Sequence, residues 1–231
     1  MRLDHYQKAP QSLRNKIELL LSRLEATVTQ ESKAAFAKII RTNPNLHIYS
    51  LGIFYNSSSW DYVLPTFASE EGLQYVAESY SFDCVDKVKE KKIALRWSVC
   101  DSPHHDDDAL LYMMPITTLL LQQLSSTLDE ADPMYNRYQW PNIYIGNYGL
   151  FYEFLSHIYE LIQRAVRLGL REVWKTPVFR DFFIANQCAL TLNTDGLAND
   201  DLLNHIKRLN TEATYNKLKK ELEQNTSKLK T

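Results

Sequence analysis

The residues from His104 to Asp108 form a dense group of metal-ligand side chains, two histidines followed by three aspartates. Carboxylate oxygens suit hard divalent cations, and imidazole suits transition metals. Consecutive side chains point in diverging directions, however, and the chain has neither the HExxH nor the DxDxDG spacing. The aspartates are instead typical of a helix start near Asp107 or Asp108, where carboxylates cap backbone N–H groups. We therefore expect no metal site and no other cofactor.

No motif for covalent catalysis is present in the sequence. Cys84, Cys100 and Cys188 form no CxxC pair, and there is no GxSxG sequence to present a nucleophilic serine. The six glycines form neither GxGxxG nor GxxxxGK, the loops that hold phosphate groups in nucleotide-binding proteins. The sequence therefore indicates no catalytic residue and favours a protein that is not an enzyme.

Arg96 and Trp97 allow an alternative interpretation. A guanidinium group can hold an anion through two parallel hydrogen bonds, and an indole ring offers a stacking surface. With His104 close by in the sequence, the pair is compatible with an uncharacterised enzyme, or a small-ligand-binding domain, whose pocket lies near Arg96 and His104. The same pair at the end of a strand is also typical of a core tryptophan beside a structural ion pair.

Charge is unevenly distributed along a chain whose net charge is only −2. Residues 98–136 contain seven acids and no Lys or Arg, and therefore carry a charge of −7. These acids are Asp101, Asp106, Asp107, Asp108, Asp129, Glu130 and Asp132. A local acidic field of this kind can steer a basic partner. Solvated loop acids and helix caps are the alternative explanation.

An aromatic-rich segment, residues 135–152, follows the acidic one. Its aromatic residues are Tyr135, Tyr138, Trp140, Tyr144, Tyr148, Phe151 and Tyr152. Tyr and Trp supply large contact areas with polar tips and are frequent at the centres of interfaces. Alternatively, these rings cover the core across a long connection. From both segments we predict five partner-binding residues, namely Asp106, Asp107, Asp108, Tyr138 and Trp140.

The elements that must position these residues are helices around a small sheet. Two apolar runs, 47–55 and 60–67, flank the polar turn 56–59 and predict an antiparallel pair of strands. Ser69 is placed to cap the helix that follows, and residues 93–98 and 187–192 predict further strands. The predicted fold class is α+β, with a small, mainly antiparallel sheet flanked by helices. Residues 1–196 form the core domain, and 197–231 form a helical C-terminal extension of that domain.

Apolar residues at helical spacing predict the remaining helices. A first apolar face covers 17–24, and after a break near 27–30 a second face covers 35–40. The charged run 87–92 is interpreted as a solvated connector, and Pro115 is expected to kink the helix that begins near Asp107 or to lie in its first turn. A long helix over 150–168 should end at Gly169. Two short helices, 200–209 and 212–223, complete the chain.

The composition is that of an ordinary globular protein of 231 residues, 45% hydrophobic and 23% charged. The opening MRLDHYQKAP lacks an apolar core, and the apolar run 110–124 is short and contains polar residues, so we expect neither a secretory signal nor a membrane partner. An odd number of cysteines fits a reducing, cytoplasmic location. In the basic tail, lysines alternate with acids and Tyr215 is the single aromatic residue, which predicts no nucleic-acid binding.

The succession of strand, polar turn, strand, helix start and arginine–tryptophan pair resembles a known bacterial family, domain of unknown function 4303. The residues that carry this resemblance are Tyr49, Phe54, Tyr55, Pro65, Thr66, Glu70, Glu71, Gly72, Leu73, Arg96, Trp97 and Ser98. The resemblance covers about the first two thirds of the chain. Proteins of this kind are similar in size and setting to immunity proteins encoded beside polymorphic toxins.

The resemblance implies an immunity-type binding protein, which neutralises a cognate toxin or effector domain by occluding its active site. This function agrees with the missing catalytic motifs and with the acidic segment beside the aromatic one. Besides the enzyme or ligand-binding alternative, a homo-oligomeric adaptor protein stays open. The sequence does not indicate an oligomeric state.

Overall fold

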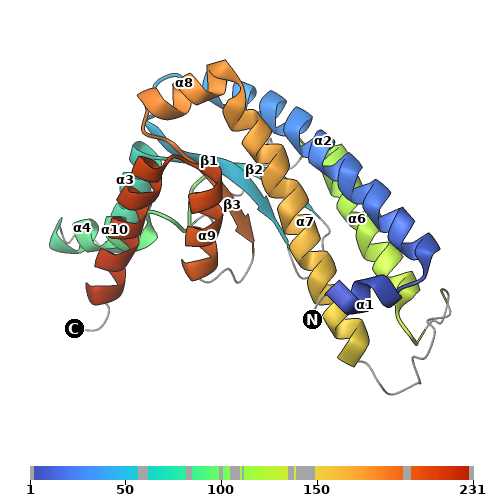
Figure 1. Cartoon of the computed structure of the whole chain (residues 1–231). Coiled ribbons are helices and arrows are strands. Elements are labelled where there is room, and N and C mark those ends of the chain that lie inside the picture. The colour runs from blue at the N-terminus through green and yellow to red at the C-terminus, as the bar shows by residue number, and fades with distance from the viewer. Residues whose placement is uncertain are drawn as a thin grey trace.

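The computed structural model describes residues 3–56, 62–81, 85–98, 101–104, 110, 112–134, 138, 149–194 and 199–228. The strands form one small sheet and the helices surround it, which confirms the predicted α+β class (Figure 1). In chain order the elements are α1 (Leu3–Lys8), α2 (Gln11–Thr42), β1 (Ile48–Tyr55), β2 (Val63–Ser69), α3 (Glu70–Ser81), α4 (Val85–Leu95), α6 (Pro115–Ala131), α7 (Gly149–Lys175), α8 (Pro177–Ala185), β3 (Ala189–Thr194), α9 (Asn199–Leu209) and α10 (Glu212–Lys228).

The sheet has three strands among the described residues, in the order β2–β1–β3. β1 pairs with β2 in the antiparallel sense, as predicted for a hairpin, and Ile53 lies opposite Pro65 on the edge strand. β3 pairs with β1 in the parallel sense, with Gly52 opposite Thr191. The sheet is therefore mixed. The helices between β2 and β3 in the chain provide the long connection that a parallel strand needs.

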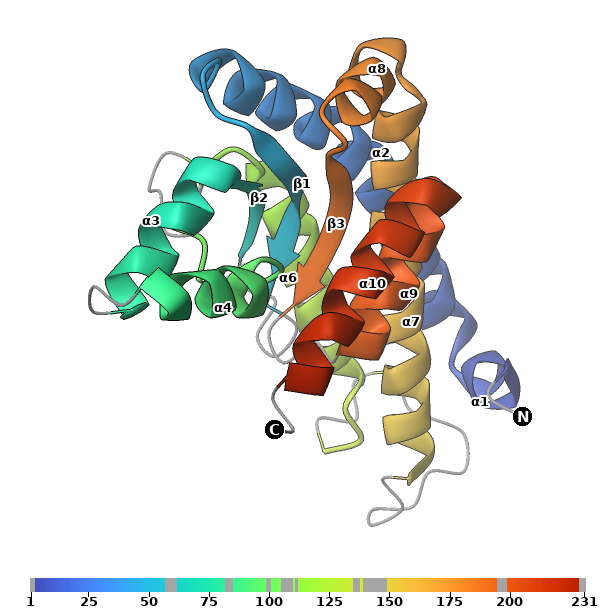
Figure 2. The ribbon, with the colours of Figure 1, turned by 90° about the vertical axis from the view of Figure 1, so that its left-hand side faces the viewer.

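The two faces of the sheet differ in chemistry. Leu51 and Ile53 of β1 and Leu190 of β3 face the main apolar core, which α2, α6 and α7 cover on the same side (Figures 1 and 2). The opposite face carries small and polar side chains over much of its area, beside Phe54 and Leu64. There the hydroxyl groups of Ser50 and Thr191 lie 3.3 Å apart, and α9 and α10 pack against β3.

The long helices α2 and α7 are continuous where the sequence predicted interruptions. α2 has no break near 27–30, because Val28 and Ser32 continue its buried face at helical spacing. Gly169 does not end α7, which continues to Lys175. A Cβ atom on Gly169 would lie 2.7 Å from the carbonyl oxygen of Glu25, so this glycine allows α7 to approach α2 closely rather than terminating the helix.

α6 begins at Pro115, so Pro115 lies in the first turn of its helix, which is one of the two predicted alternatives. The helix start predicted near Asp107 or Asp108 lies outside the described residues. Proline suits this first helical position because its backbone nitrogen has no hydrogen to leave unpaired. The next two N–H groups, of Ile116 and Thr117, donate to the carboxylate of Glu31 on α2, at 3.0 and 2.9 Å. A carboxylate from another helix therefore caps α6.

The predicted strand over 93–98 is wrong, and so is the solvated connector before it. Residues 85–95 form one helix, α4, which contains the charged run and the first half of the supposed strand. Lys, Glu, Ala and Leu are good helix formers, and the charges fall at spacings where side chains of opposite sign are neighbours. Local helix propensity therefore decides this segment.

Other sequence predictions are confirmed. The hydroxyl of Ser69 accepts the N–H of Gly72 at 3.0 Å, so Ser69 caps α3 as expected. The strand predicted at 187–192 is β3, and the two C-terminal helices are α9 and α10. Ile206 of α9 and Leu218 of α10 form a second small core with Ala189 of β3.

Candidate functional site

Acidic and aromatic residues meet at the C-terminal end of α6. The hydroxyl of Tyr138 lies 3.5 Å from Oε2 of Glu130, and Nζ of Lys16 lies 3.3 Å from the same oxygen. Asp129, the preceding residue of α6, is exposed. Part of the acidic segment and part of the aromatic segment therefore share one surface.

Tyr159 of α7 extends this surface. Its side chain is 40% exposed, and its pKa is raised by burial and by the negative charge of Asp129. The phenol group of α7 and the carboxylate of α6 therefore interact through charge. We call Asp129, Glu130, Tyr138 and Tyr159 the acidic–aromatic surface. Its carboxylates can accept hydrogen bonds from a basic partner, and its rings offer apolar contact area.

The structure describes one of the five residues predicted to bind a partner. Tyr138 is half-buried and packs against the main core while its hydroxyl reaches Glu130. The other four, Asp106, Asp107, Asp108 and Trp140, lie outside the described residues.

Tyr159 was not among the predicted site residues. A usable signal for it was present in the sequence, since Tyr152 and Tyr159 lie seven residues apart, or about two helical turns. Both are exposed on α7, at 63% and 40%. The two tyrosines therefore lie on one exposed face of α7 and not in its buried stripe.

Arg96 lies in a closed ionic cluster that joins β1, α3 and α10. Its Nη1 donates to Oε2 of Glu70 at 3.1 Å, and its Nη2 donates to Oε1 of the same residue. Its Nε lies 3.3 Å from Oε2 of Glu221 on α10. The guanidinium group also lies 4.4 Å from the ring centre of Tyr49. Two carboxylates therefore neutralise Arg96, and the structural ion pair is the interpretation that this geometry supports.

The pKa values in this cluster follow from burial and from the charges within it. Burial opposes the charged form of Arg96, but Glu70 and Glu221 more than compensate and raise its pKa above the ordinary value. Burial likewise opposes the charged form of Glu70, yet the hydrogen bond and charge of Arg96 lower its pKa. The neighbouring Trp97 donates its indole N–H to Glu221 at 3.1 Å, so the pair Arg96–Trp97 fastens α10 to the fold.

The cavity beside Arg96 is too small for a substrate. It lies over the polar face of the sheet, between Arg96 and Asn193, and its volume is about 10 Å³. A single water molecule needs roughly this space. His104 does not line this cavity, and its ring stacks on Phe67 with 4.1 Å between ring centres. The described residues therefore do not favour the alternative pocket near Arg96 and His104.

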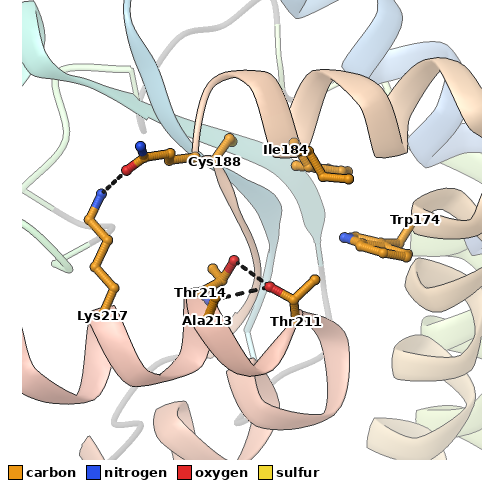
Figure 3. A pocket seen from close by; sticks show the side chains of 9 residues that line it. Trp174, Ile184, Cys188, Thr211, Ala213, Thr214 and Lys217 are labelled. Atoms are coloured by element: carbon orange, nitrogen blue, oxygen red, sulfur yellow. Dashed lines mark hydrogen bonds between the residues drawn. The ribbon is translucent and has the colours of Figure 1, made fainter.

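A larger groove of about 210 Å³ lies between α8 and the start of α10 (Figure 3). Trp174 and Ile184 line one side, and Thr211 and Thr214 lie across from them. The thiol of Cys188 is buried there, and burial raises its pKa well above the ordinary range. The thiolate is the reactive form of cysteine, so this side chain is a packing residue rather than a nucleophile.

Two further searches bear on what the described part of the chain can do. Among these residues, no three His, Cys, Asp or Glu side chains are grouped so that they could hold a metal ion. None of the helices described here is both long enough and apolar enough to cross a bilayer.

Comparisons with protein-family models, with curated proteins and with solved structures found no match to this chain. The resemblance to domain of unknown function 4303 therefore stays a prediction that depends on the sequence residues that carry it.

Proposed function

We propose that this chain is an immunity-type binding protein that neutralises a cognate bacterial toxin in the cytoplasm by occluding the toxin's active site. The acidic–aromatic surface is the proposed contact region. The observation that carries the proposal is the contact between Tyr138 and Glu130, because it brings acidic and aromatic residues together on one surface. The family resemblance supplies the class of partner.

The surface has the chemistry that such an interface needs. Carboxylates at its rim would speed the encounter with a basic partner, since complementary charge acts mainly on the association rate. Tyrosine rings at its centre would slow dissociation, because aromatic side chains supply much of the binding energy in protein interfaces. Asp129 and Tyr159 contribute one side chain of each kind from two different helices.

Co-expression with the protein encoded beside this gene tests the proposal. The neighbouring protein should be toxic alone and harmless together with the wild-type chain. Asp129→Lys should weaken the complex through a slower association rate at low salt, and Tyr159→Ala should weaken it through faster dissociation. Glu90→Lys, which reverses an exposed carboxylate on α4, serves as the matched control and should change neither rate.

Two outcomes would contradict the proposal. Undiminished toxicity in the presence of the wild-type chain would remove the immunity function. Protection that persists with unchanged rates in both Asp129→Lys and Tyr159→Ala would place the interface elsewhere on the molecule. Circular dichroism of each variant keeps a folding defect separate from a binding defect.

A further inference from the structure

A cleft of about 460 Å³ runs between α7 and α9 and is lined mainly by basic side chains. The basic residues that α7 contributes, at positions 157, 164 and 167, are seven and three residues apart and lie on one helix face, and the two from α9, at 205 and 208, are three apart. The basic residues of the cleft are His157, Arg164, Arg167, His205 and Arg208. Glu160 is the one acidic residue in its lining. In Figure 2, α9 and α10 lie in front of α7, so the two walls come from neighbouring helices.

The three arginines of this cleft outnumber Glu160, the carboxylate in its lining. In the part of the chain that the structure describes, no Asp or Glu oxygen lies within ion-pair distance of Arg164, Arg167 or Arg208. Burial lowers the pKa of Arg167, and the positive charge of Arg208 lowers it further; Tyr55 opposes this shift and Arg164 adds to it. Three arginines against one glutamate leave the lining of the cleft with an excess of positive charge.

His205 supports Arg167 from the other wall. Its side chain is only 4% exposed, and its Nδ1 lies 3.5 Å from Nη1 of Arg167. A guanidinium group can only donate, so Nδ1 accepts and the histidine is oriented with its unprotonated nitrogen towards Arg167. The buried ring thus limits the directions in which Arg167 can point, and its N–H groups are held in place before any ligand binds.

We propose that this cleft binds a small molecule through a phosphate group. Three guanidinium groups in the lining of one cleft match a ligand with close to two negative charges and three terminal oxygens, as in a phosphate monoester. Arginine forms paired hydrogen bonds to such oxygens, which a single ammonium group cannot do. The cleft volume falls in the range of about 300 to 1,000 Å³ that is typical of small-ligand sites. It therefore has room for the organic part of a phosphorylated compound.

The proposal is independent of the toxin-binding function. The cleft uses Arg164, Arg167 and Arg208 of α7 and α9, whereas the acidic–aromatic surface is centred on the end of α6. Either function can therefore fail in experiment without deciding the other.

Titration calorimetry of the full chain with inorganic phosphate, ADP and citrate, all at the same ionic strength, tests this site. Saturable binding of phosphate or ADP is expected, and citrate, which offers carboxylates instead, should bind more weakly. Tighter binding of ADP than of phosphate would identify a phosphorylated metabolite, and equal binding would identify free phosphate as the ligand. Binding of neither, or stronger binding of citrate, would overturn the proposal.

Variants decide whether any binding occurs in the cleft. Arg208→Ala removes an exposed guanidinium group and should lower the affinity by about tenfold or more, since a charge-assisted hydrogen bond contributes roughly 1.5 to 3 kcal/mol. Arg171→Ala removes an exposed arginine of α7 that does not line the cleft and should bind as the wild type does. Unchanged affinity in Arg208→Ala would place the ligand elsewhere and overturn the proposal. Circular dichroism of both variants confirms that they are folded.

Discussion

Arg96 and Arg167 are both partly buried arginines, but they have opposite neighbours. Arg96 lies between the carboxylates of Glu70 and Glu221, whereas Arg167 lies near two further arginines. Burial disfavours the charge of both residues, and the neighbours then raise the pKa of Arg96 and lower that of Arg167. We infer that an arginine whose charge is balanced by two carboxylates has a structural role, whereas an arginine beside other cations is available to bind an anion.

The comparison predicts its largest effect for Arg96→Met. This substitution keeps an apolar stem but leaves Glu70 and Glu221 partly buried without their shared cation. We expect the free energy of unfolding to fall by roughly 2 to 4 kcal/mol, because removing one partner of a buried ion pair exposes the cost of burying the other. Urea denaturation near neutral pH measures this. Arg180→Met, at an exposed position on α8, is the control. Equal stability of Arg96→Met and Arg180→Met would show that the cluster does not stabilise the fold.

The second prediction concerns pH. The pKa of Glu70 lies below its ordinary value of 4.5, so this carboxylate contributes stability above that value and loses it as the pH falls through the lower, folded pKa. Glu70→Gln should therefore be less stable than the wild type near neutral pH, and the difference should shrink between roughly pH 5 and pH 3. Urea titrations across this range measure the difference. Glu90→Gln, on an exposed face of α4, should show no such trend. If the stability difference between the wild type and Glu70→Gln grows as the pH falls, the ionised form of Glu70 does not stabilise the fold.

Sequence patterns determine the helices and the hairpin of this fold because those elements depend on local rules. The serine cap at Ser69 and the paired runs of β1 and β2 were predictable from turn and cap chemistry. The helix α4 was not, because the apolar run at its end has the composition of a short strand and periodicity alone does not separate the two. The role of Gly169 depends on the carbonyl of Glu25, which belongs to a distant part of the chain.

The site was less predictable than the fold. Tyr138 was foreseen from composition, but its contact with Glu130 depends on how the chain turns after α6. The cleft was missed because its arginines belong to two helices, and each helix alone has the spacing of an ordinary solvated face. Only tertiary packing shows that Arg96 meets carboxylates, whereas Arg167 shares its cleft with two further arginines.

The third prediction replaces Arg167 by methionine, as the first prediction does for Arg96. Arg167→Met, measured in phosphate-free buffer, should change the free energy of unfolding by less than about 1 kcal/mol. Relief of the repulsion from Arg164 and Arg208 stabilises the variant, and loss of the hydrogen bond to the buried His205 opposes this gain. The same urea denaturation as for Arg96→Met provides the measurement. A loss as large as that of Arg96→Met would show that Arg167 has a stabilising partner and would remove the distinction between the two regions.

The smallest expected effect concerns salt. Arg208 is exposed, so its repulsion of Arg167 is weak and screened by ions. Arg208→Ala should raise the free energy of unfolding by about 0.5 kcal/mol at low ionic strength, and this gain should vanish near about 0.5 M NaCl. Urea denaturation at both NaCl concentrations measures the change, with Arg171→Ala as the control. An equal gain in the free energy of unfolding at both concentrations would arise from packing or helix propensity. It would contradict repulsion between the arginines of the cleft, which is the feature that distinguishes the cleft from the Arg96 cluster.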